Sequence, residues 1–183
     1  MEIVIGISGA SGAQYGIRLL EVLSEMDIGT HLVLTEAAKK ILTVETDYTS
    51  EDIEDMATAV YDEKDFTAPI ASGSHPFEGM IIAPCSMKTL ASVANGTSDN
   101  LIARTADVCL KERRKLILMT RETPLSGIHI ENMLRAHNAG AILLPACPGF
   151  YNRPSTMEEL IDFMAGRALD LMKIENSIYR RWK

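Results

Sequence analysis

No apolar stretch in this sequence approaches the roughly 20 residues that a membrane-spanning helix requires. The first residues also lack the basic, apolar and small-residue order of a signal peptide. Only three cysteines occur, at wide spacings and without a CxxC or CxxH pair: Cys85, Cys109 and Cys147. This favours reduced thiols and gives no zinc motif. We therefore expect a cytoplasmic protein with no membrane segment and no bound metal.

Positive charge is also scarce, because 18 Lys and Arg residues face 25 Asp and Glu residues, for a net charge of −7. Without a basic field, the chain is not expected to bind nucleic acid. The 183 residues, 46% of them hydrophobic, are enough for one sizeable core. No internal repeat or linker is visible. We interpret residues 1–183 as a single domain with a C-terminal tail from about residue 174.

Short apolar runs alternate with amphipathic stretches along the chain. The runs predict strands at 3–7, 30–34, 79–83, 115–119 and 141–144. The stretches predict helices at 13–26, 36–44, 49–57, 86–94, 100–112, 126–138 and 156–172. Residues 61–77 are interpreted as a loop with room for one short strand. Strands without polar alternation are covered on both faces. The pattern thus predicts an α/β fold, a three-layer Rossmann-like sandwich with a mainly parallel sheet.

Ligands of such sheets bind beyond the carboxyl ends of the strands. The first of these turns reads G-x-x-G-x-x-G from Gly6 to Gly12, which is neither the dinucleotide nor the Walker pattern. The free N–H groups of the following helix suit an anion, so we expect a phosphate-bearing cofactor at this turn. A tight turn without a ligand is the alternative. After the second strand, Thr35 suits a phosphate or a flavin ribityl chain, whereas Glu36 suits a nicotinamide ribose.

Two later turns carry further polar chemistry. Ser86 and Thr89 offer hydroxyls at a helix start, either for an anion or simply as an N-cap. Arg121 offers a planar fork to phosphate. Glu122 beside it would transfer a proton if burial raised its pKa, or the two would form a surface ion pair. Tyr151 ends a stiff proline-containing loop, but buried aromatic residues usually belong to a core, so by itself it is weak evidence for a site.

Taken together, these motifs resemble the UbiX-type flavin prenyltransferases, within the wider group of flavin-dependent cysteine-decarboxylase-like proteins. The matching segments, in order, are Gly9-Ala10-Ser11-Gly12-Ala13-x-Tyr15-Gly16, Glu45-Thr46-Asp47, Cys85-Ser86-x-x-Thr89, Asn100-Leu101-Ile102-x-Arg104, Lys111-Glu112-Arg113-Arg114, Arg121-Glu122-x-Pro124, His129-x-Glu131-Asn132-Met133, Pro148-Gly149-Phe150-Tyr151 and Arg167. Trp182 matches a late aromatic residue. The resemblance covers nearly the whole chain.

The resemblance implies that dimethylallyl monophosphate alkylates reduced FMN at N5 and C6, without a metal. The product, prenylated FMN, would serve a partner decarboxylase. A homo-oligomer, commonly a dodecamer, is also implied. The residues that would hold FMN are Gly9, Ala10, Ser11, Thr35, Ser86, Met87, Lys88, Thr89 and Arg121. Those that would surround the prenyl phosphate are Arg104, Lys111, Glu122, Tyr151, Arg167 and Trp182. The resemblance assigns catalysis to Ser11, Glu45, Glu122, Lys111 and Tyr151.

Physical reasoning agrees with this set, because ionising an allylic phosphate requires cations on the leaving group in a dry pocket. The ring proton would pass to Glu45, Glu122 or the released phosphate. Two alternatives remain. A flavin-dependent decarboxylase of a cysteine-type substrate would need a histidine soon after the second helix, where His75 is the nearest candidate. A non-catalytic flavin carrier would have no use for Lys111, Tyr151 and Arg167 together.

Overall fold

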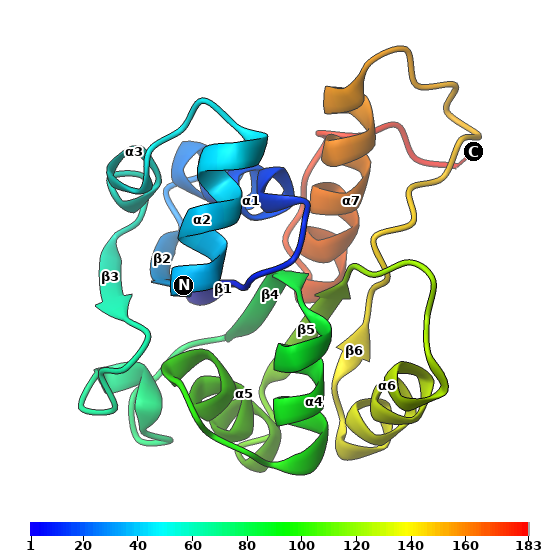
Figure 1. Cartoon of the computed structure of the whole chain (residues 1–183). Helices are drawn as coiled ribbons and strands as arrows, with labels where there is room; N and C mark the ends of the chain where they lie inside the picture. The colour runs from blue at the N-terminus through cyan, green and yellow to red at the C-terminus, as the bar shows by residue number, and fades with distance from the viewer. Residues whose placement is uncertain (183) are drawn as a thin grey trace.

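The computed structural model describes residues 1–182 and contains one six-stranded sheet in which every pairing is parallel (Figure 1). The strand order is β3-β2-β1-β4-β5-β6. The strands are β1 (Glu2–Ile7), β2 (Gly29–Leu34), β3 (Ala59–Asp62), β4 (Gly79–Cys85), β5 (Lys115–Thr120) and β6 (Ile142–Leu143). The predicted parallel sheet is confirmed.

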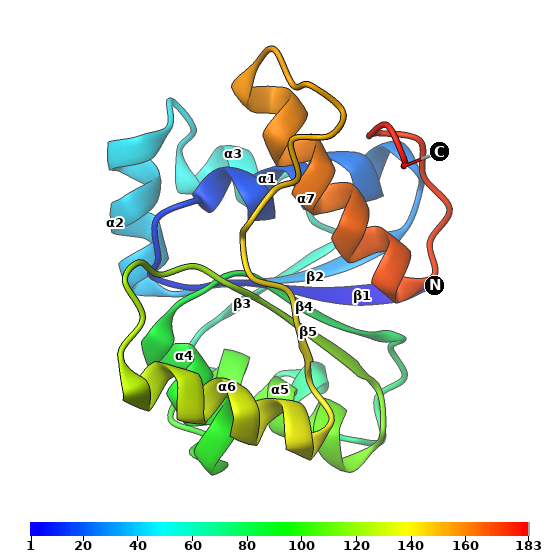
Figure 2. The same ribbon diagram turned by 90° about the vertical axis from the view of Figure 1, so that its right-hand side faces the viewer.

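Helices cover both faces of the sheet. They are α1 (Ala13–Glu25), α2 (Glu36–Glu45), α3 (Ser50–Glu54), the 3-10 turn η1 (Pro69–Ala71), α4 (Met87–Asn95), α5 (Leu101–Lys111), α6 (Gly127–Ala139) and α7 (Met157–Met172). Figure 2 shows α1, α2 and α7 on one side of the sheet and α4, α5 and α6 on the other. The three-layer sandwich expected from the sequence is therefore confirmed.

Each face of the sheet has its own apolar core. Ile3 and Ile5 of β1 belong to the cluster that includes Leu20 of α1 and Leu169 of α7. Val4, which points to the opposite face, belongs to the cluster beneath α4 and α5. All three of these β1 side chains have no exposed surface. This burial on both faces explains why the central strands are continuous apolar runs.

The edges of the sheet differ most from the sequence prediction. β3 lies within and just before the segment interpreted as a loop, and it pairs with β2 at one edge. Its side chains alternate between half-buried and exposed, and Val60 is 41% exposed. An edge strand of this kind has no apolar run to reveal it. The helix expected at 49–57 is shorter, because α3 ends at Glu54.

The C-terminal tail packs back against α7. Ile174 is buried, and the ring of Tyr179 lies edge-on to Phe163 with 5.3 Å between centroids. Asp170 of α7 accepts hydrogen bonds from the Tyr179 hydroxyl at 2.6 Å and from the Arg181 guanidinium at 2.7 Å. Within residues 1–182, no helix is both long enough and apolar enough to cross a membrane.

At Gly16, α1 packs tightly against the sheet, and this packing leads to a prediction. A Cβ at this position would press on the Ala83 carbonyl oxygen and lie 2.6 Å from Cδ1 of Ile7. Overpacking of this kind costs about 1–3 kcal/mol, whereas the helix propensity of Ala returns only about 1 kcal/mol. Because a backbone atom cannot move aside easily, we expect Gly16→Ala to lower the free energy of unfolding by about 1 kcal/mol, measured by urea denaturation.

The matched control is Gly127→Ala at the start of α6, where an added Cβ meets no atom within 4 Å. This variant should be neutral or slightly stabilised. Equal stability of the two variants would show that the contact between α1 and β4 is not as tight as described.

Candidate functional site

A cleft of about 440 Å³ opens at the carboxyl ends of the central strands. The residues that line it come from the turns after β1, β2, β3, β4 and β5 and from the cap of α5: Gly9, Ala10, Ser11, Thr35, Ala37, Glu63, Ser86, Met87, Lys88, Thr89, Asn100, Arg121 and Glu122. Every residue that the sequence assigned to FMN is in this set. The structure thus brings together side chains that are more than 100 positions apart in the chain.

One wall of the cleft is the start of α4. Ser86 caps this helix, with its Oγ accepting a hydrogen bond from the Thr89 backbone N–H at 3.2 Å. The Ser86 N–H in turn donates to Oγ of Ser8 at 2.8 Å, which ties the turn to the end of β1. The next N–H groups, of Met87 and Lys88, have no partner within the helix because they belong to its first turn. Together with the hydroxyls, they make this helix end suitable for a phosphate.

The start of α1 has a different role from the one first inferred. Gly12, with φ of 105°, gives this helix no side-chain cap. Instead Glu45, the last residue of α2, accepts hydrogen bonds from the N–H of Gly12 at 2.7 Å and of Ala13 at 3.3 Å. A carboxylate of the chain itself therefore occupies the anion position of α1. The structure does not favour a cofactor phosphate at this helix end, since two of its N–H groups already donate to Glu45.

Several contacts act in opposite directions on the pKa of Glu45. Partial burial raises it, whereas the Ser11 hydroxyl, the Gly12 and Ala13 N–H groups and the charge of Arg121 lower it. The lowering contacts outweigh burial, so the pKa of Glu45 lies below its usual value of 4.5. A carboxylate held in its ionised form is a good cap and a weak base.

Arg121 and Glu122 follow β5 and form the opposite wall of the cleft. Nε of Arg121 donates to the Ser11 carbonyl oxygen at 3.0 Å, which joins this wall to the glycine turn. Glu122 is exposed and accepts a hydrogen bond from the Thr123 N–H at 2.9 Å. The burial expected to tune Glu122 for proton transfer is therefore not supplied within a single chain.

Glu63 and Asn100 line the cleft but were not assigned to it from the sequence. Oε1 of Glu63 accepts from the Glu36 N–H at 3.1 Å, and its backbone oxygen accepts from the Leu101 N–H at 2.7 Å. Asn100 caps α5 through the Ala103 N–H at 2.9 Å. Asn100 could have been recognised as a helix cap. Glu63 lies in the patternless segment and gave no signal.

Glu36 itself was a candidate for a nicotinamide ribose, and the structure does not support that alternative. Its carboxylate lies 3.6 Å from Nζ of Lys39, one turn along α2, and it does not line the cleft. Thr35, immediately before it, does line the cleft and caps α2 through the Ala38 N–H at 3.1 Å. Of the two residues, only Thr35 can contact a ligand there.

Two of the residues expected around the prenyl phosphate lie on α5. Arg104 donates to the Ala71 carbonyl oxygen at 3.1 Å and pairs with Asp107 at 3.0 Å. Lys111 is the last residue of the helix and pairs with Glu112 at 2.7 Å. Because α5 begins at the cleft, Lys111 is about 15 Å away along the helix axis. The chain by itself does not bring Lys111 to the cleft.

The remaining three of these residues lie around α7, on the opposite side of the sheet from α5. The ring of Tyr151 lies edge-on to Trp182, with 5.0 Å between centroids. Arg167 pairs with Asp170 at 3.2 Å. Tyr151 is 41% and Trp182 is 76% exposed. Of the residues expected around the prenyl phosphate, only Glu122 lines the cleft within one chain.

His75, which a cysteine-type decarboxylase would require near the flavin, is far from the cleft. It lies beside Glu2 and His31, at the amino-terminal edge of the sheet. Parallel strands separate this edge from the carboxyl ends where the cleft opens. The structure therefore removes the only histidine candidate for that alternative.

Comparisons with known proteins agree over the full length of the chain. The family model described as Flavoprotein matches residues 1–181. The flavin prenyltransferase UbiX of Methanocaldococcus jannaschii is 48% identical over 182 residues, which cover 100% of this chain and 98% of that protein. The solved structure of AnUbiX (PadA1), in complex with FMN and dimethylallyl pyrophosphate, has a TM-score of 0.98 at 46% identity and covers 100% of this chain and 97% of its own.

A second solved structure is the dodecameric FMN-dependent UbiX-like decarboxylase from Escherichia coli O157:H7. Its TM-score is 0.98 at 43% identity, with complete coverage of both chains. The likeness in fold extends over every element described above.

The Glu45 cap generates a prediction about pH. Replacing a capping group costs about 1 kcal/mol, to which the helix dipole contributes. Because the folded pKa of Glu45 lies below the usual 4.5, its stabilisation is complete above that pH and is lost as the pH falls through the folded value. We expect Glu45→Gln to destabilise the protein by about 1 kcal/mol at neutral pH and by progressively less in acid, measured by denaturant titration across pH.

The control is Glu25→Gln, an exposed carboxylate at the other end of α1. A negative charge there faces the negative end of the dipole, so its removal should be neutral or slightly stabilising. A cost of Glu45→Gln that did not shrink in acid would contradict the ionic cap.

Proposed function

This chain belongs to the flavoprotein family and, within it, to the UbiX-type flavin prenyltransferases; we propose that it joins the dimethylallyl group of dimethylallyl monophosphate to N5 and C6 of reduced FMN. The product, prenylated FMN, serves a partner decarboxylase. The observation that carries the proposal is the cleft, where all the residues expected to hold FMN meet in a chain that matches its relatives over its whole length.

The cleft suits FMN in size and in chemistry. Its volume of about 440 Å³ lies in the range of pockets for ligands of this size. The FMN phosphate is assigned to the start of α4, where Ser86 and Thr89 offer hydroxyls and the first-turn N–H groups point outward. Thr35, on the wall formed by α2, offers a third hydroxyl to the phosphate or the ribityl chain. Reduced FMN, when bound, supplies the nucleophilic nitrogen and carbon of its ring.

The glycine turn and Arg121 orient the ring. Gly9, Ala10 and Ser11 present backbone and a small hydroxyl at the mouth of the cleft, so the flat ring can approach closely. The bond from Nε of Arg121 to the Ser11 carbonyl oxygen fixes the two walls relative to each other. Ser11 and Arg121 thereby act as positioning groups for the acceptor.

Glu122 is the proposed acceptor of the ring proton. Two carboxylates are candidates, Glu45 beside the glycine turn and Glu122 in the cleft. Glu45 already caps α1, and its pKa is lowered. Glu122 lines the cleft, and its carboxylate has only a local bond to the Thr123 N–H. Of these two carboxylates, Glu122 is therefore the one left free to take a proton from a ring bound in the cleft.

Additional copies of the chain complete the site. The leaving phosphate needs cations, and the allyl group needs aromatic faces and exclusion of water. Tyr151 and Trp182 form an aromatic pair that is largely exposed. Arg167 lies on α7, on the same side of the sheet as this pair. Lys111 and Arg104 are on the other side of the sheet. In the homo-oligomer proposed here, such groups from one copy lie over the cleft of another. The relative from Escherichia coli is dodecameric, which supports an assembly of several copies.

The enzyme is assigned to the cytoplasm. All three cysteines are free thiols, two of them buried and Cys147 exposed. An exposed free thiol persists in a reducing compartment, where disulfides are rare.

The direct test is anaerobic. Protein, reduced FMN and dimethylallyl monophosphate are mixed, and the flavin is analysed by mass spectrometry for the added prenyl group. Unchanged flavin under these conditions would refute the proposed reaction. Glu122→Gln should bind FMN normally but turn over about 10²–10⁴-fold more slowly, because a proton acceptor is removed.

The matched control is Glu131→Gln, an exposed carboxylate on α6 that does not line the cleft. This variant should react at the normal rate. Loss of FMN binding in Glu122→Gln would mean that Glu122 holds the cofactor and does not take the proton.

A site shared between copies predicts complementation. Glu122→Gln changes the cleft, and Arg167→Ala changes α7 while Asp170 keeps its bonds to Arg181. Each variant alone should be slow. Oligomers assembled from a mixture of the two should regain activity, because some sites then combine Glu122 of one copy with Arg167 of another.

The control mixture combines Glu122→Gln with Thr89→Ala, two changes in the same cleft of one chain. No site in this mixture has an intact cleft, so no activity should return. If the first mixture were no more active than the second, the site would lie within one chain.

A further inference from the structure

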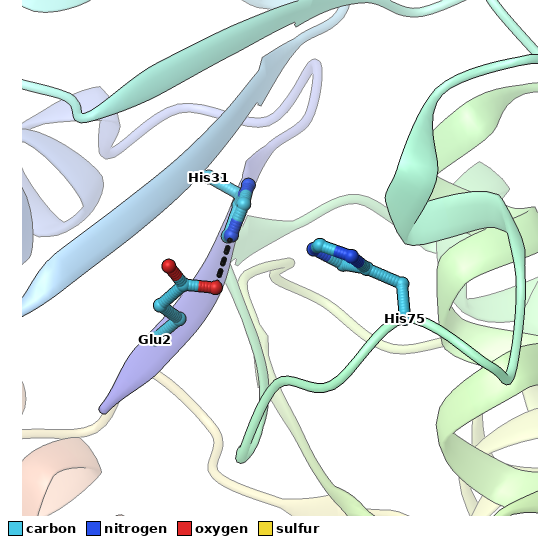
Figure 3. Close-up of side chains that lie close together, drawn as sticks. All are labelled: Glu2, His31 and His75. Atoms are coloured by element: carbon cyan, nitrogen blue, oxygen red, sulfur yellow. Dashed lines mark hydrogen bonds and ion pairs between the residues drawn. The ribbon is translucent and has the colours of Figure 1, made fainter.

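Three potential metal ligands meet at the edge of the sheet opposite the FMN cleft (Figure 3). Glu2 begins β1, His31 lies in β2, and His75 lies in the loop that leads from η1 to β4. One ligand atom from each of these residues lies within 4.8 Å of the other two. Among residues 1–182, this is the one group of three such side chains that could hold an ion. The reaction proposed above makes no use of it.

The ring of His31 is fixed on both sides. It is only 7% exposed, and its Nδ1 lies 3.1 Å from the hydroxyl of Tyr61, whose ring stacks on it. Its Nε2 lies 3.1 Å from Oε2 of Glu2. When Nδ1 donates its hydrogen to Tyr61, the lone pair on Nε2 faces a carboxylate oxygen. The 3.1 Å spacing between Nε2 of His31 and Oε2 of Glu2 thus fits either a hydrogen carried on Nε2 or, in this tautomer, a cation held between the two atoms.

The side chain of His75 has an unpaired nitrogen at the same place. Its ring lies edge-on to that of His31, with 5.5 Å between centroids. Nε2 of His75 is buried and has no hydrogen-bond partner in the described part of the chain. Buried polar nitrogens without a partner are rare in folded proteins. Figure 3 shows the three side chains converging from three separate segments.

The backbone that carries His75 is held firmly. Arg114 donates to the carbonyl oxygen of His75 at 2.8 Å and to that of Gly73 at 2.7 Å. Its guanidinium lies over the ring of Phe77, 4.2 Å from the centroid. The unpaired nitrogen is therefore not the result of a loosely placed loop.

We propose that Glu2, His31 and His75 bind one divalent transition-metal ion, with Zn²⁺ as the best match to two imidazoles and one carboxylate. Zinc bonds of about 2.0–2.1 Å place neighbouring donors of a tetrahedron roughly 3.3 Å apart, close to the spacing of His31 and Glu2. Small rotations of the exposed Glu2 and of His75 close the remaining distance. Water fills the fourth position, and Tyr61 orients His31 as an outer hydrogen-bond partner.

The ion has a structural role. At about 3.3 Å per residue, β1 separates Glu2 from the glycine turn by roughly 17 Å, which is too far to touch a ligand in the cleft. The ion joins β1, β2 and the loop before β4. The first two are already paired in the sheet, and the segment just before β4 meets β1 through the Glu78 N–H bond to the Glu2 carbonyl oxygen at 2.9 Å. Metal removal should therefore leave FMN binding unchanged. The proposed metal site does not depend on the proposed reaction.

The test measures Zn²⁺ binding to chelator-treated, tag-free protein by equilibrium dialysis. Co²⁺ is used in parallel as a spectroscopic probe, because its visible bands report the nitrogen and oxygen donors. We expect one ion per chain. Tyr61→Phe removes only the outer partner and should weaken binding about 10–100-fold. His75→Ala should weaken it further, and Glu2→Gln provides a second ligand change at an exposed position that leaves the buried His31 in place.

The matched control is His137→Ala, an exposed histidine on α6, which should bind Zn²⁺ as the unchanged protein does. The proposal is overturned if the unchanged protein binds no stoichiometric Zn²⁺, or if His75→Ala and Glu2→Gln bind it as tightly as His137→Ala.

Discussion

Parallel pairing of the strands is the constraint on which the rest of the structure depends. Because every strand points the same way, the turns that follow β1, β2, β4 and β5 all open at one edge, and the cleft forms there. The same rule gathers Glu2, His31 and His75 at the opposite edge. Apolar cores on both faces hold the sheet together, and the polar residues lie at its two ends.

The starts of α1 and α4, which both lie beside the cleft, differ in what binds their N–H groups. Both α1 and α4 offer the positive end of a dipole and free N–H groups. Glu45 accepts hydrogen bonds from two N–H groups at the start of α1. Its own negative charge then disfavours the binding of a second anion at the glycine turn. Only α4 keeps its first-turn N–H groups for a ligand, with Ser86 and Thr89 beside them. This difference between the two helix starts is why the proposed binding mode assigns the phosphate to the start of α4 and the ring to the glycine turn.

The cleft of one chain is incomplete for prenyl transfer. It contains hydroxyls, Arg121 and Glu122, but the aromatic pair of Tyr151 and Trp182 lies around α7 and Lys111 lies at the far end of α5. These groups are on opposite sides of the sheet, so the fold of one copy keeps them apart. This separation is the reason for proposing a site that several copies share.

The sequence by itself determined the parallel α/β fold, because continuous apolar strands are possible only where both faces are covered. It also identified most of the residues that line the cleft, since they lie where a strand ends and the next helix begins. It left room for a short strand near residue 61 but did not locate β3, whose half-exposed side chains leave no apolar run, and it did not assign Glu63 or Asn100 to the cleft. Tertiary structure alone decided that Glu45 and not a ligand caps α1, and that His75 meets Glu2 and His31. These contacts join positions far apart in the chain, and a local sequence pattern does not indicate which distant residues meet.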